Sequence, residues 1–274
     1  MFRKQRGAGE QARPASGWEA ASPVATVVAS WPEQPGSRFP SFPRGAARRR
    51  SGSDRPPASV HRGVLSREEA VRRLTLVESR DDETARHIDQ MSRYCALLAV
   101  RAGLGTDRAE LIRKAARLHD IGKICIPRHI LLKPERLTSE EFQIVQRHAK
   151  IGHDILAGSG VDWMELGAVI ALTHHEHHDG GGYPRGLAGT QIPFVGRIAA
   201  IADVFDALTS RRPYKSALST QSAVDIMLEG RGRQFDPFAL DLFLRSLDEI
   251  LSIRDESSDL LISSPRGTLV ACGG

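Results

Sequence analysis

A histidine and an aspartate stand side by side in the run Leu118-His119-Asp120-Ile121-Gly122-Lys123, and a lysine follows them within one turn. An adjacent imidazole and carboxylate can bind a metal ion, and the ammonium group of Lys123 can neutralise a phosphate oxygen. The combination is typical of a metal-dependent phosphohydrolase. Because an adjacent His-Asp pair also arises by chance in many chains, the prediction depends on whether further metal-ligand residues accompany it.

Two more histidines lie on the predicted inward faces of helices. His87 stands beside an apolar stripe, and Glu83 precedes it by one turn on the same helix face. His148 is in register with isoleucine and valine residues and therefore also faces inward. A lone histidine at such a position is more often a satisfied core residue than a ligand.

The remaining candidates make that simpler interpretation improbable for the set as a whole. His174 and His175 end an apolar helix, from which adjacent histidines can reach two different metals. Asp203 lies in an almost wholly apolar run, where a carboxylate is costly unless it is paired or metal-bound. Nitrogen and oxygen ligands without a thiolate favour Fe, Mn or Mg over a structural zinc site.

The apolar spacing predicts helices throughout the region that carries these residues. Steps of three and four define an amphipathic helix over about residues 82–102: Ile88, Met91, Cys95, Leu98 and Ala102. Thr106 or Asp107 is expected to cap the next helix, and Thr138-x-x-Glu141 is a capping-box candidate for another. Further helices are expected over about 162–174, 193–209, 220–228 and 237–247. The predicted fold class is all-α, a single helical bundle over residues 81–250.

The segments outside this bundle differ in composition. Residues 1–60 contain eight of the 15 prolines and carry a net charge of +6, which leaves about −1 for the rest of the chain. Such a segment is expected to be disordered. Residues 61–80 are predicted to form a linker helix, a candidate homodimer contact, and residues 251–274 a loose tail. Because the positive charge belongs to the leading segment, the sequence pI does not predict binding to a nucleic acid polymer.

Cysteine usage and hydropathy indicate the redox compartment and whether the chain crosses a membrane. The three cysteines lie far apart with no CxxC pair, which favours a reducing compartment over a disulfide framework. No apolar run approaches the roughly 20 residues that cross a bilayer. We therefore expect no transmembrane segment and a cytoplasmic location.

Several motifs follow one another in a specific order. The most specific block runs from His174 to Gly189 and contains Gly182-Tyr183-Pro184. The others are Glu83-Thr84 with His87, His119 to Lys123, Ala202 to Thr209, Arg212-Pro213-Tyr214-Lys215 and Phe235-Asp236-Pro237. Over about residues 78–245 the chain resembles the HD-GYP family, a branch of the HD phosphohydrolases that hydrolyse the bacterial second messenger cyclic di-GMP.

The resemblance implies a role for each matched residue. The family's metal ligands fall on His87, His119, Asp120, His148, His174, His175 and Asp203, and Glu83 matches a residue that in some members helps to hold a third metal. Two or three divalent ions, Fe or Mn, are therefore expected. His119, Asp120 and Lys123 are the expected catalytic residues. The residues expected to contact the nucleotide are Lys123, Gly182, Tyr183, Pro184, Arg212 and Lys215.

The implied activity is metal-dependent hydrolysis of cyclic di-GMP to linear pGpG, and then in some cases to GMP, by a hydroxide activated at the metals. Two alternatives stay open at this point. One is a catalytically silent module that binds cyclic di-GMP and signals through a partner. The other is an HD hydrolase that acts on another cyclic dinucleotide. The Gly182-Tyr183-Pro184 loop is a candidate contact for signalling proteins.

Overall fold

The computed structural model describes the backbone of residues 82–210 and 217–262, and side chains within residues 85–210 and 217–256. The described elements are α3 (Asp82–Arg101), α4 (Thr106–Ala116), η1 (Ile121–Cys125), α5 (Arg128–Leu131), α6 (Ser139–Leu156), α7 (Asp162–Thr173), η2 (Gly189–Gln191), α8 (Phe194–Thr209), α9 (Thr220–Glu229), α10 (Pro237–Arg245) and α11 (Leu247–Ile262). The predicted all-α class is confirmed, since no strand occurs among these residues. The predicted disordered segment, residues 1–60, and the linker helix, residues 61–80, lie outside them.

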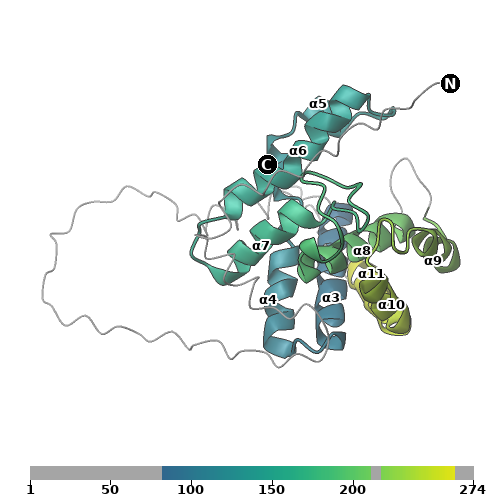
Figure 1. Cartoon of the computed structure of the whole chain (residues 1–274). Helices are drawn as coiled ribbons and strands as arrows, with labels where there is room; N and C mark the ends of the chain where they lie inside the picture. The colour runs from purple at the N-terminus through teal and green to yellow at the C-terminus, as the bar shows by residue number, and fades with distance from the viewer. Residues whose placement is uncertain (1–81, 211–216, 263–274) are drawn as a thin grey trace, which may run out of the picture.

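Helices α3 and α4 lie side by side, and α7 packs against α4 while α8 packs against both α3 and α7 (Figure 1). Helix α6 packs on α7 and η1, and the short α5 packs beside the N-terminal end of α6. Helices α10 and α11 cover the opposite side of α3. Because α3, α6, α7 and α8 meet around the turn that follows α4, residues from five parts of the sequence converge there.

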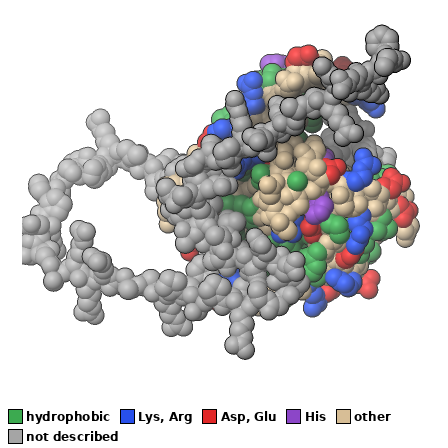
Figure 2. Space-filling model, in the orientation of Figure 1, with side chains coloured by type: hydrophobic (Ala, Val, Ile, Leu, Met, Phe, Trp, Pro, Cys, Tyr) green, Lys and Arg blue, Asp and Glu red, His purple; other side chains and the backbone are tan. Residues whose placement is uncertain are grey.

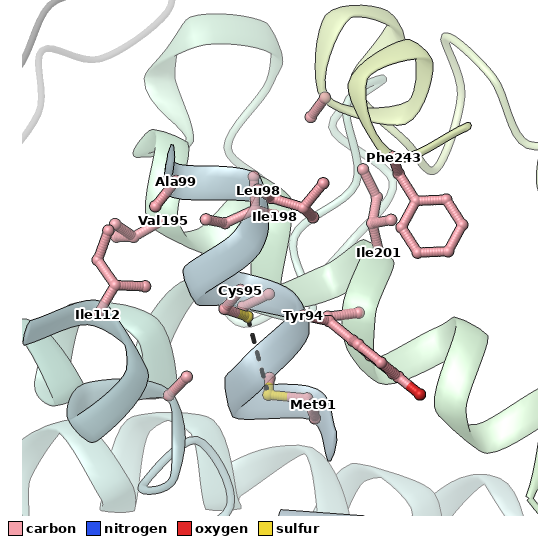
Figure 3. Close-up of a cluster of buried hydrophobic side chains, with 14 of the residues drawn as sticks. Met91, Tyr94, Cys95, Leu98, Ala99, Ile112, Val195, Ile198, Ile201 and Phe243 are labelled. Atoms are coloured by element: carbon pink, nitrogen blue, oxygen red, sulfur yellow. Dashed lines mark hydrogen bonds between the residues drawn. The ribbon is translucent and has the colours of Figure 1, made fainter. Parts of the chain in front are cut away.

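The main core forms where the apolar stripe of α3 meets α8 and α10. Met91, Cys95 and Leu98 are fully buried, and Figure 3 shows Leu98 beside Ile198 of α8. The ring of Phe205 on α8 lies 4.9 Å from that of Phe243 on α10. Burying a large apolar side chain contributes about 1.5–3 kcal/mol, so this stripe makes α3 a rigid support for any group on its edge.

Two predicted helix starts have different outcomes. The Thr138–Glu141 capping box is confirmed, with both reciprocal hydrogen bonds formed. The expected cap at Thr106 or Asp107 is wrong, because α4 begins one residue earlier with Gly105 as its N-cap and no side-chain cap. Gly105 has a φ of 77°, which glycine adopts without strain, so the tight turn places Thr106 and Asp107 inside the first helical turn.

The prediction of a loose tail from residue 251 is wrong for residues 251–262, which continue α11. Ile250 is fully buried in the core, and the carbonyl of Arg254 accepts a hydrogen bond of 3.1 Å from Gln90 on α3. Glu249 also pairs with Arg101. Ser252, Asp255 and Glu256 are exposed on this packed helix, and composition alone does not distinguish such a polar face from a tail. Residues 263–274 lie outside the described part.

The described surface has a mixed charge. In Figure 2, Lys and Arg side chains are interspersed with Asp and Glu side chains over the visible described face. This mixture agrees with a net charge near zero beyond the leading segment. Among the described helices, none is both long and apolar enough to cross a bilayer.

Candidate metal centre

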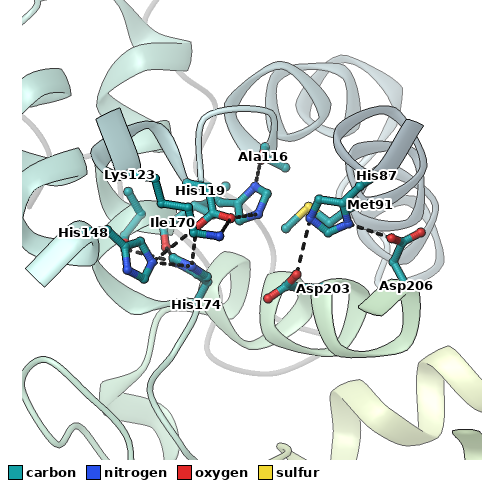
Figure 4. Close-up of polar contacts among 12 residues, drawn as sticks. His87, Met91, Ala116, His119, Lys123, His148, Ile170, His174, Asp203 and Asp206 are labelled. Carbon is teal, nitrogen blue, oxygen red and sulfur yellow. Dashed lines mark hydrogen bonds and ion pairs between the residues drawn. The ribbon is translucent and has the colours of Figure 1, made fainter. Parts of the chain in front are cut away.

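Seven predicted ligand residues converge into two neighbouring groups. We call them the His148 group (Asp120, His148, His174 and His175) and the His87 group (His87, His119 and Asp203). Within each group the candidate ligand atoms all lie within 4.8 Å of one another. They come from α3, the turn after α4, α6, the end of α7 and α8 (Figure 4). Glu83, the eighth predicted ligand, lies outside the residues whose side chains are described.

The Asp120 carboxylate lies between the two groups. Its Oδ1 atom is 3.3 Å from Nε2 of His148 and 3.8 Å from Nε2 of His174, while Oδ2 is 3.3 Å from Nε2 of His119. Asp120 Oδ1 and His119 Nε2 are buried without a hydrogen-bond partner. A buried polar atom that lacks a partner is costly, so these atoms fit a site completed by cations. A carboxylate in this position can provide one oxygen ligand to a cation in each group.

Three histidines are oriented by backbone carbonyls. The Nδ1 contacts are from His119 to the Ala116 carbonyl (3.0 Å), from His148 to that of Val145 (2.7 Å) and from His174 to that of Ala171 (3.0 Å). A carbonyl can only accept a hydrogen bond, so Nδ1 carries the proton and donates it. The Nε2 atom of each ring therefore faces the candidate metal site, and Nε2 without its proton is the form that binds a metal.

His87 is oriented differently. Its Nδ1 atom lies 2.6 Å from Oδ2 of Asp206, and its Nε2 atom lies 3.5 Å from Oδ1 of Asp203. Asp206 is only 1% exposed and also accepts a hydrogen bond of 3.2 Å from the Ser210 hydroxyl. The sequence motifs predict no role for Asp206. The available signal was its spacing of three from Asp203 on an otherwise apolar helix, which puts both carboxylates on one face.

The electrostatics of the His148 group favour neutral imidazoles and an ionised carboxylate. Burial lowers the pKa of His148 and His175, and it lowers that of His174 to about 4. Burial acts to raise the pKa of Asp120, but the nearby Lys123 and His119 lower it well below its usual value. The group therefore presents bare ring nitrogens and a negative oxygen at neutral pH, the forms that bind a cation.

The His87 group has one protonated member when no metal is bound. Burial acts to lower the pKa of His119, but the adjacent Asp120 carboxylate outweighs it and raises this pKa to about 9. Burial acts to raise the pKa of Asp203, but His119 and His87 lower it overall. A cation that enters this group must therefore displace a proton from His119.

Gly122 and Lys123 follow Asp120 in η1 and lie beside the candidate site. The Lys123 ammonium contacts Oδ2 of Asp120, while the side chain is 41% exposed and so reaches the solvent-facing side. At Gly122 a Cβ atom would lie 2.0 Å from the carbonyl oxygen of His148. Only glycine permits this close approach of η1 to α6, and it brings Asp120 and Lys123 to His148.

The Gly182-Tyr183-Pro184 loop lies against the second of the paired histidines. The Tyr183 ring stacks on the His175 ring with centroids 4.7 Å apart and planes 27° apart, and the Tyr183 N–H donates to the His175 carbonyl. A Cβ at Gly182 would lie 2.2 Å from the backbone nitrogen of His177. The absence of a side chain at Gly182 therefore allows the chain to turn back and place Tyr183 beside the metal site.

The Glu176 side chain fixes the part of the chain that follows Pro184. Its side chain is buried, with the residue only 2% exposed, and its carboxylate accepts hydrogen bonds from the backbone N–H groups of Arg185 (2.8 Å) and Leu187 (2.9 Å). Glu176 lies within the block from His174 to Gly189, but the motif predicts no role for it. Its signal was its position directly after the histidine pair. Arg212 and Lys215, which the resemblance implies as nucleotide contacts, lie outside the described residues.

Comparisons with known proteins bear on the family to which the chain is related. A family model described as HD domain matches residues 70–238. The chain is 44% identical over 187 residues to the cyclic di-GMP phosphodiesterase response regulator RpfG of Xanthomonas campestris, covering 68% of this chain and 50% of that protein. It is 42% identical over 183 residues to 3′3′-cGAMP-specific phosphodiesterase 2 of Vibrio cholerae, covering 67% and 35%.

A further relative and a solved structure complete the comparison. A cyclic di-GMP phosphodiesterase of Thermotoga maritima is 44% identical over 184 residues, covering 67% of this chain and 50% of that protein. The crystal structure of the cyclic GMP-AMP specific phosphodiesterase V-cGAP3 of V. cholerae aligns with a TM-score of 0.50 at 18% identity, covering 73% of this chain and 54% of that chain, which is a likeness of fold. The chain spans about half the length, or less, of these three curated relatives. It belongs to the HD domain family, and the resemblance to the HD-GYP branch is confirmed.

Proposed function

We propose that this chain is a metal-dependent phosphodiesterase that hydrolyses cyclic di-GMP to linear pGpG. The observation that carries the proposal is the convergence of seven nitrogen and oxygen donors into two adjoining groups, with Asp120 between them and buried atoms left without partners. Two divalent ions, Fe or Mn, fit such a donor set, with one in each group. A third ion would require Glu83.

The proposed ligands have defined tasks. His148, His174 and His175 would hold one ion, His87, His119 and Asp203 the other, and Asp120 both. Two bound divalent ions supply Lewis acidity to a phosphodiester, lower the pKa of water and steady the leaving oxygen. The Nδ1 contacts keep the imidazoles in the ligating tautomer, so the protein does not reorganise when the ions bind.

The remaining residues would act on the substrate itself. Lys123, beside Asp120 and partly exposed, would neutralise a non-bridging phosphate oxygen. In the hydrolysis, the oxygen of water bonds to phosphorus, the bond from phosphorus to the 3′ oxygen breaks, and that oxygen takes up a proton. The product is a linear dinucleotide with a 5′ phosphate. Tyr183 would contact the nucleotide from the loop, and Arg212 and Lys215 would bind its phosphates or the acceptor edges of guanine.

A second candidate substrate has support of its own. One of the compared relatives is named a 3′3′-cGAMP-specific phosphodiesterase. The two cyclic dinucleotides differ in one base, so the same metal centre can serve either, and the choice would depend on contacts to the bases. A catalytically silent binding module is the less favoured candidate, because all seven described ligand positions are occupied by ligand residues.

The test is a turnover assay with metal analysis. The full chain, loaded with Fe or Mn under reducing conditions, is incubated separately with cyclic di-GMP and 3′3′-cGAMP, and the products are separated by chromatography. We expect linear pGpG from cyclic di-GMP and a higher kcat/KM for it than for 3′3′-cGAMP. Binding without cleavage in protein with full metal content would favour the silent module. A reversed kcat/KM ratio would identify the cGAMP enzyme.

A further inference from the structure

An exposed aromatic residue stands next to the loop at the metal site. Phe142, in the first turn of α6, is 46% exposed. By contrast, Phe205, Phe235 and Phe243 are buried in the core. Single exposed apolar side chains also occur elsewhere in the described residues, such as Ile226 at 44%, so the position of Phe142 beside the loop carries the argument, and its exposure leaves the ring free to contact another molecule.

The Phe142 ring continues a row of rings that begins at the metal centre. Its centroid lies 6.1 Å from that of Tyr183, with the planes 82° apart. The other side of the row is the stacked pair of Tyr183 and His175, and the His148 ring is 6.4 Å from Tyr183. A nearly perpendicular contact covers at most one face of the Phe142 ring. The exposed part therefore adjoins the loop and the metal site without being covered by Tyr183.

We propose that Phe142 is a substrate-binding residue whose exposed ring packs against a nucleobase of the cyclic dinucleotide while the scissile phosphate lies at Asp120 and Lys123. This inference rests on the proposed function. It assigns to α6 a second task besides carrying His148. Stacking on an aromatic side chain is a recurrent way for proteins to bind bases, because every base has a π face.

The dimensions of α6 support this placement. Phe142 precedes His148 by six residues, a separation of about 9 Å along the helix axis. A nucleotide spans a comparable distance from its phosphate to the far edge of its base. The polar end of the substrate would thus meet the metal centre, and its apolar face would meet Phe142 at the site margin. The capping box and the Lys133–Glu141 ion pair fix the first turn of α6, so the ring is held on an ordered support.

The competing explanation is that Phe142 only packs against Tyr183 and supports the loop. Three substitutions separate the two roles. Phe142→Ala removes the ring, Phe142→Leu keeps apolar volume without a π face, and Phe142→Trp keeps a π face. Ile226→Ala is the matched control, because Ile226 is 44% exposed on α9, which carries none of the candidate ligands. The metal-loaded full chain is assayed with cyclic di-GMP for KM, kcat and metal content.

We expect Phe142→Ala to raise KM about tenfold with kcat and metal content close to wild type, a loss typical of one base-stacking contact. Phe142→Leu should raise KM by several-fold, Phe142→Trp should restore it to within about twofold, and Ile226→Ala should leave it unchanged. Restoration by Phe142→Leu, or a fall in kcat and metal content at constant KM, would overturn the base contact in favour of loop support. Equal effects of Phe142→Ala and Ile226→Ala would overturn it too.

The same experiment distinguishes this inference from the proposed function. If the wild-type chain with full metal content neither cleaves nor binds cyclic di-GMP, the proposed function fails and the base contact fails with it. If the wild-type chain is active and Phe142→Ala retains the wild-type KM, the proposed function stands and only the role of Phe142 is overturned.

Discussion

The two halves of the candidate metal centre differ in what orients their histidines. In the His148 group, Nδ1 of His148 and Nδ1 of His174 donate to backbone carbonyls within their own helices. In the His87 group, His119 likewise donates to a backbone carbonyl, but Nδ1 of His87 faces the buried carboxylate of Asp206, on a different helix. Side-chain substitution does not remove a backbone carbonyl, whereas a single substitution removes a carboxylate. His148 and His174 are therefore oriented from within their own helices, whereas the orientation of His87 depends on a tertiary contact.

The difference also affects charge. A carboxylate behind an imidazole increases the basicity of the ligating nitrogen and adds a negative charge to the shell around the metal. The His87 group would hold its cation with Asp203 in contact and Asp206 one step behind. The His148 group would rely on three imidazoles and the shared Asp120. The two groups should respond differently to mutation and to pH, although they share one carboxylate.

The largest effect is expected from the loss of Asp120, because its carboxylate lies next to both groups. Asp120→Ala removes the oxygen atoms that lie next to both groups, so both should lose metal and turnover should fall by more than about a hundredfold. Elemental analysis alongside steady-state kinetics would measure this. Asp225→Ala, an exposed carboxylate on α9, is the control and should change neither quantity. Full metal content in Asp120→Ala would refute the assignment of Asp120 as a shared ligand.

The next largest effect is expected from a substitution that weakens the His87 group alone. Asp206→Asn keeps the size of the side chain but removes the negative charge, so we expect metal affinity of the His87 group and turnover to fall by roughly 10–100-fold. The His148 group should retain its metal, so total metal content should move towards half of the wild-type value.

Ser210→Ala serves as the control for Asp206→Asn, since it removes only the 3.2 Å hydrogen bond to the Asp206 carboxylate. It should leave metal content near that of wild type. Equal loss of metal from both groups in Asp206→Asn would show that Asp206 supports the whole site and not His87 in particular.

The pH dependence of metal binding should separate the groups as well. The raised pKa of His119, about 9, means that its ring is protonated below that pH in the metal-free protein. Metal binding to the His87 group must release this proton, so its affinity should rise about tenfold per pH unit up to about pH 9 and then level off. In the His148 group the pKa values of the three histidines are lowered, to about 4 for His174, so its affinity should change little between pH 6 and 9.

Calorimetric titration with Mn²⁺ in two buffers of different ionisation enthalpy would count the protons released. We expect close to one proton for the His87 group at pH 7 and none for the His148 group. Release of no proton from either group would mean that His119 is neutral before the metal arrives.

The candidate ligands could be predicted from the sequence, whereas the groups that orient them could not. His87, His148 and Asp203 could be placed inward because the helical period of their apolar neighbours is a local property. The contact between His87 and Asp206 joins positions 119 residues apart, and no local period encodes it. The same holds for α11, whose packing against α3 involves Gln90 and Arg254. A polar composition there suggested a tail because the partner surface is not visible in the sequence.

The smallest effect is expected from a substitution at Val145, whose carbonyl orients His148. Val145 supplies the carbonyl that accepts from Nδ1 of His148, and Val145→Ala leaves that carbonyl in place. We expect metal content and turnover within about twofold of wild type, with stability lowered by about 1 kcal/mol or less because a half-buried side chain loses two methyl groups. Thermal unfolding and elemental analysis would check both quantities. Asp206→Asn should show the opposite result, with large losses of metal at similar stability. If Val145→Ala depleted metal as strongly as Asp206→Asn, side-chain packing would have to orient His148, and the distinction between a His148 oriented by its helix and a His87 oriented by a tertiary contact would fail.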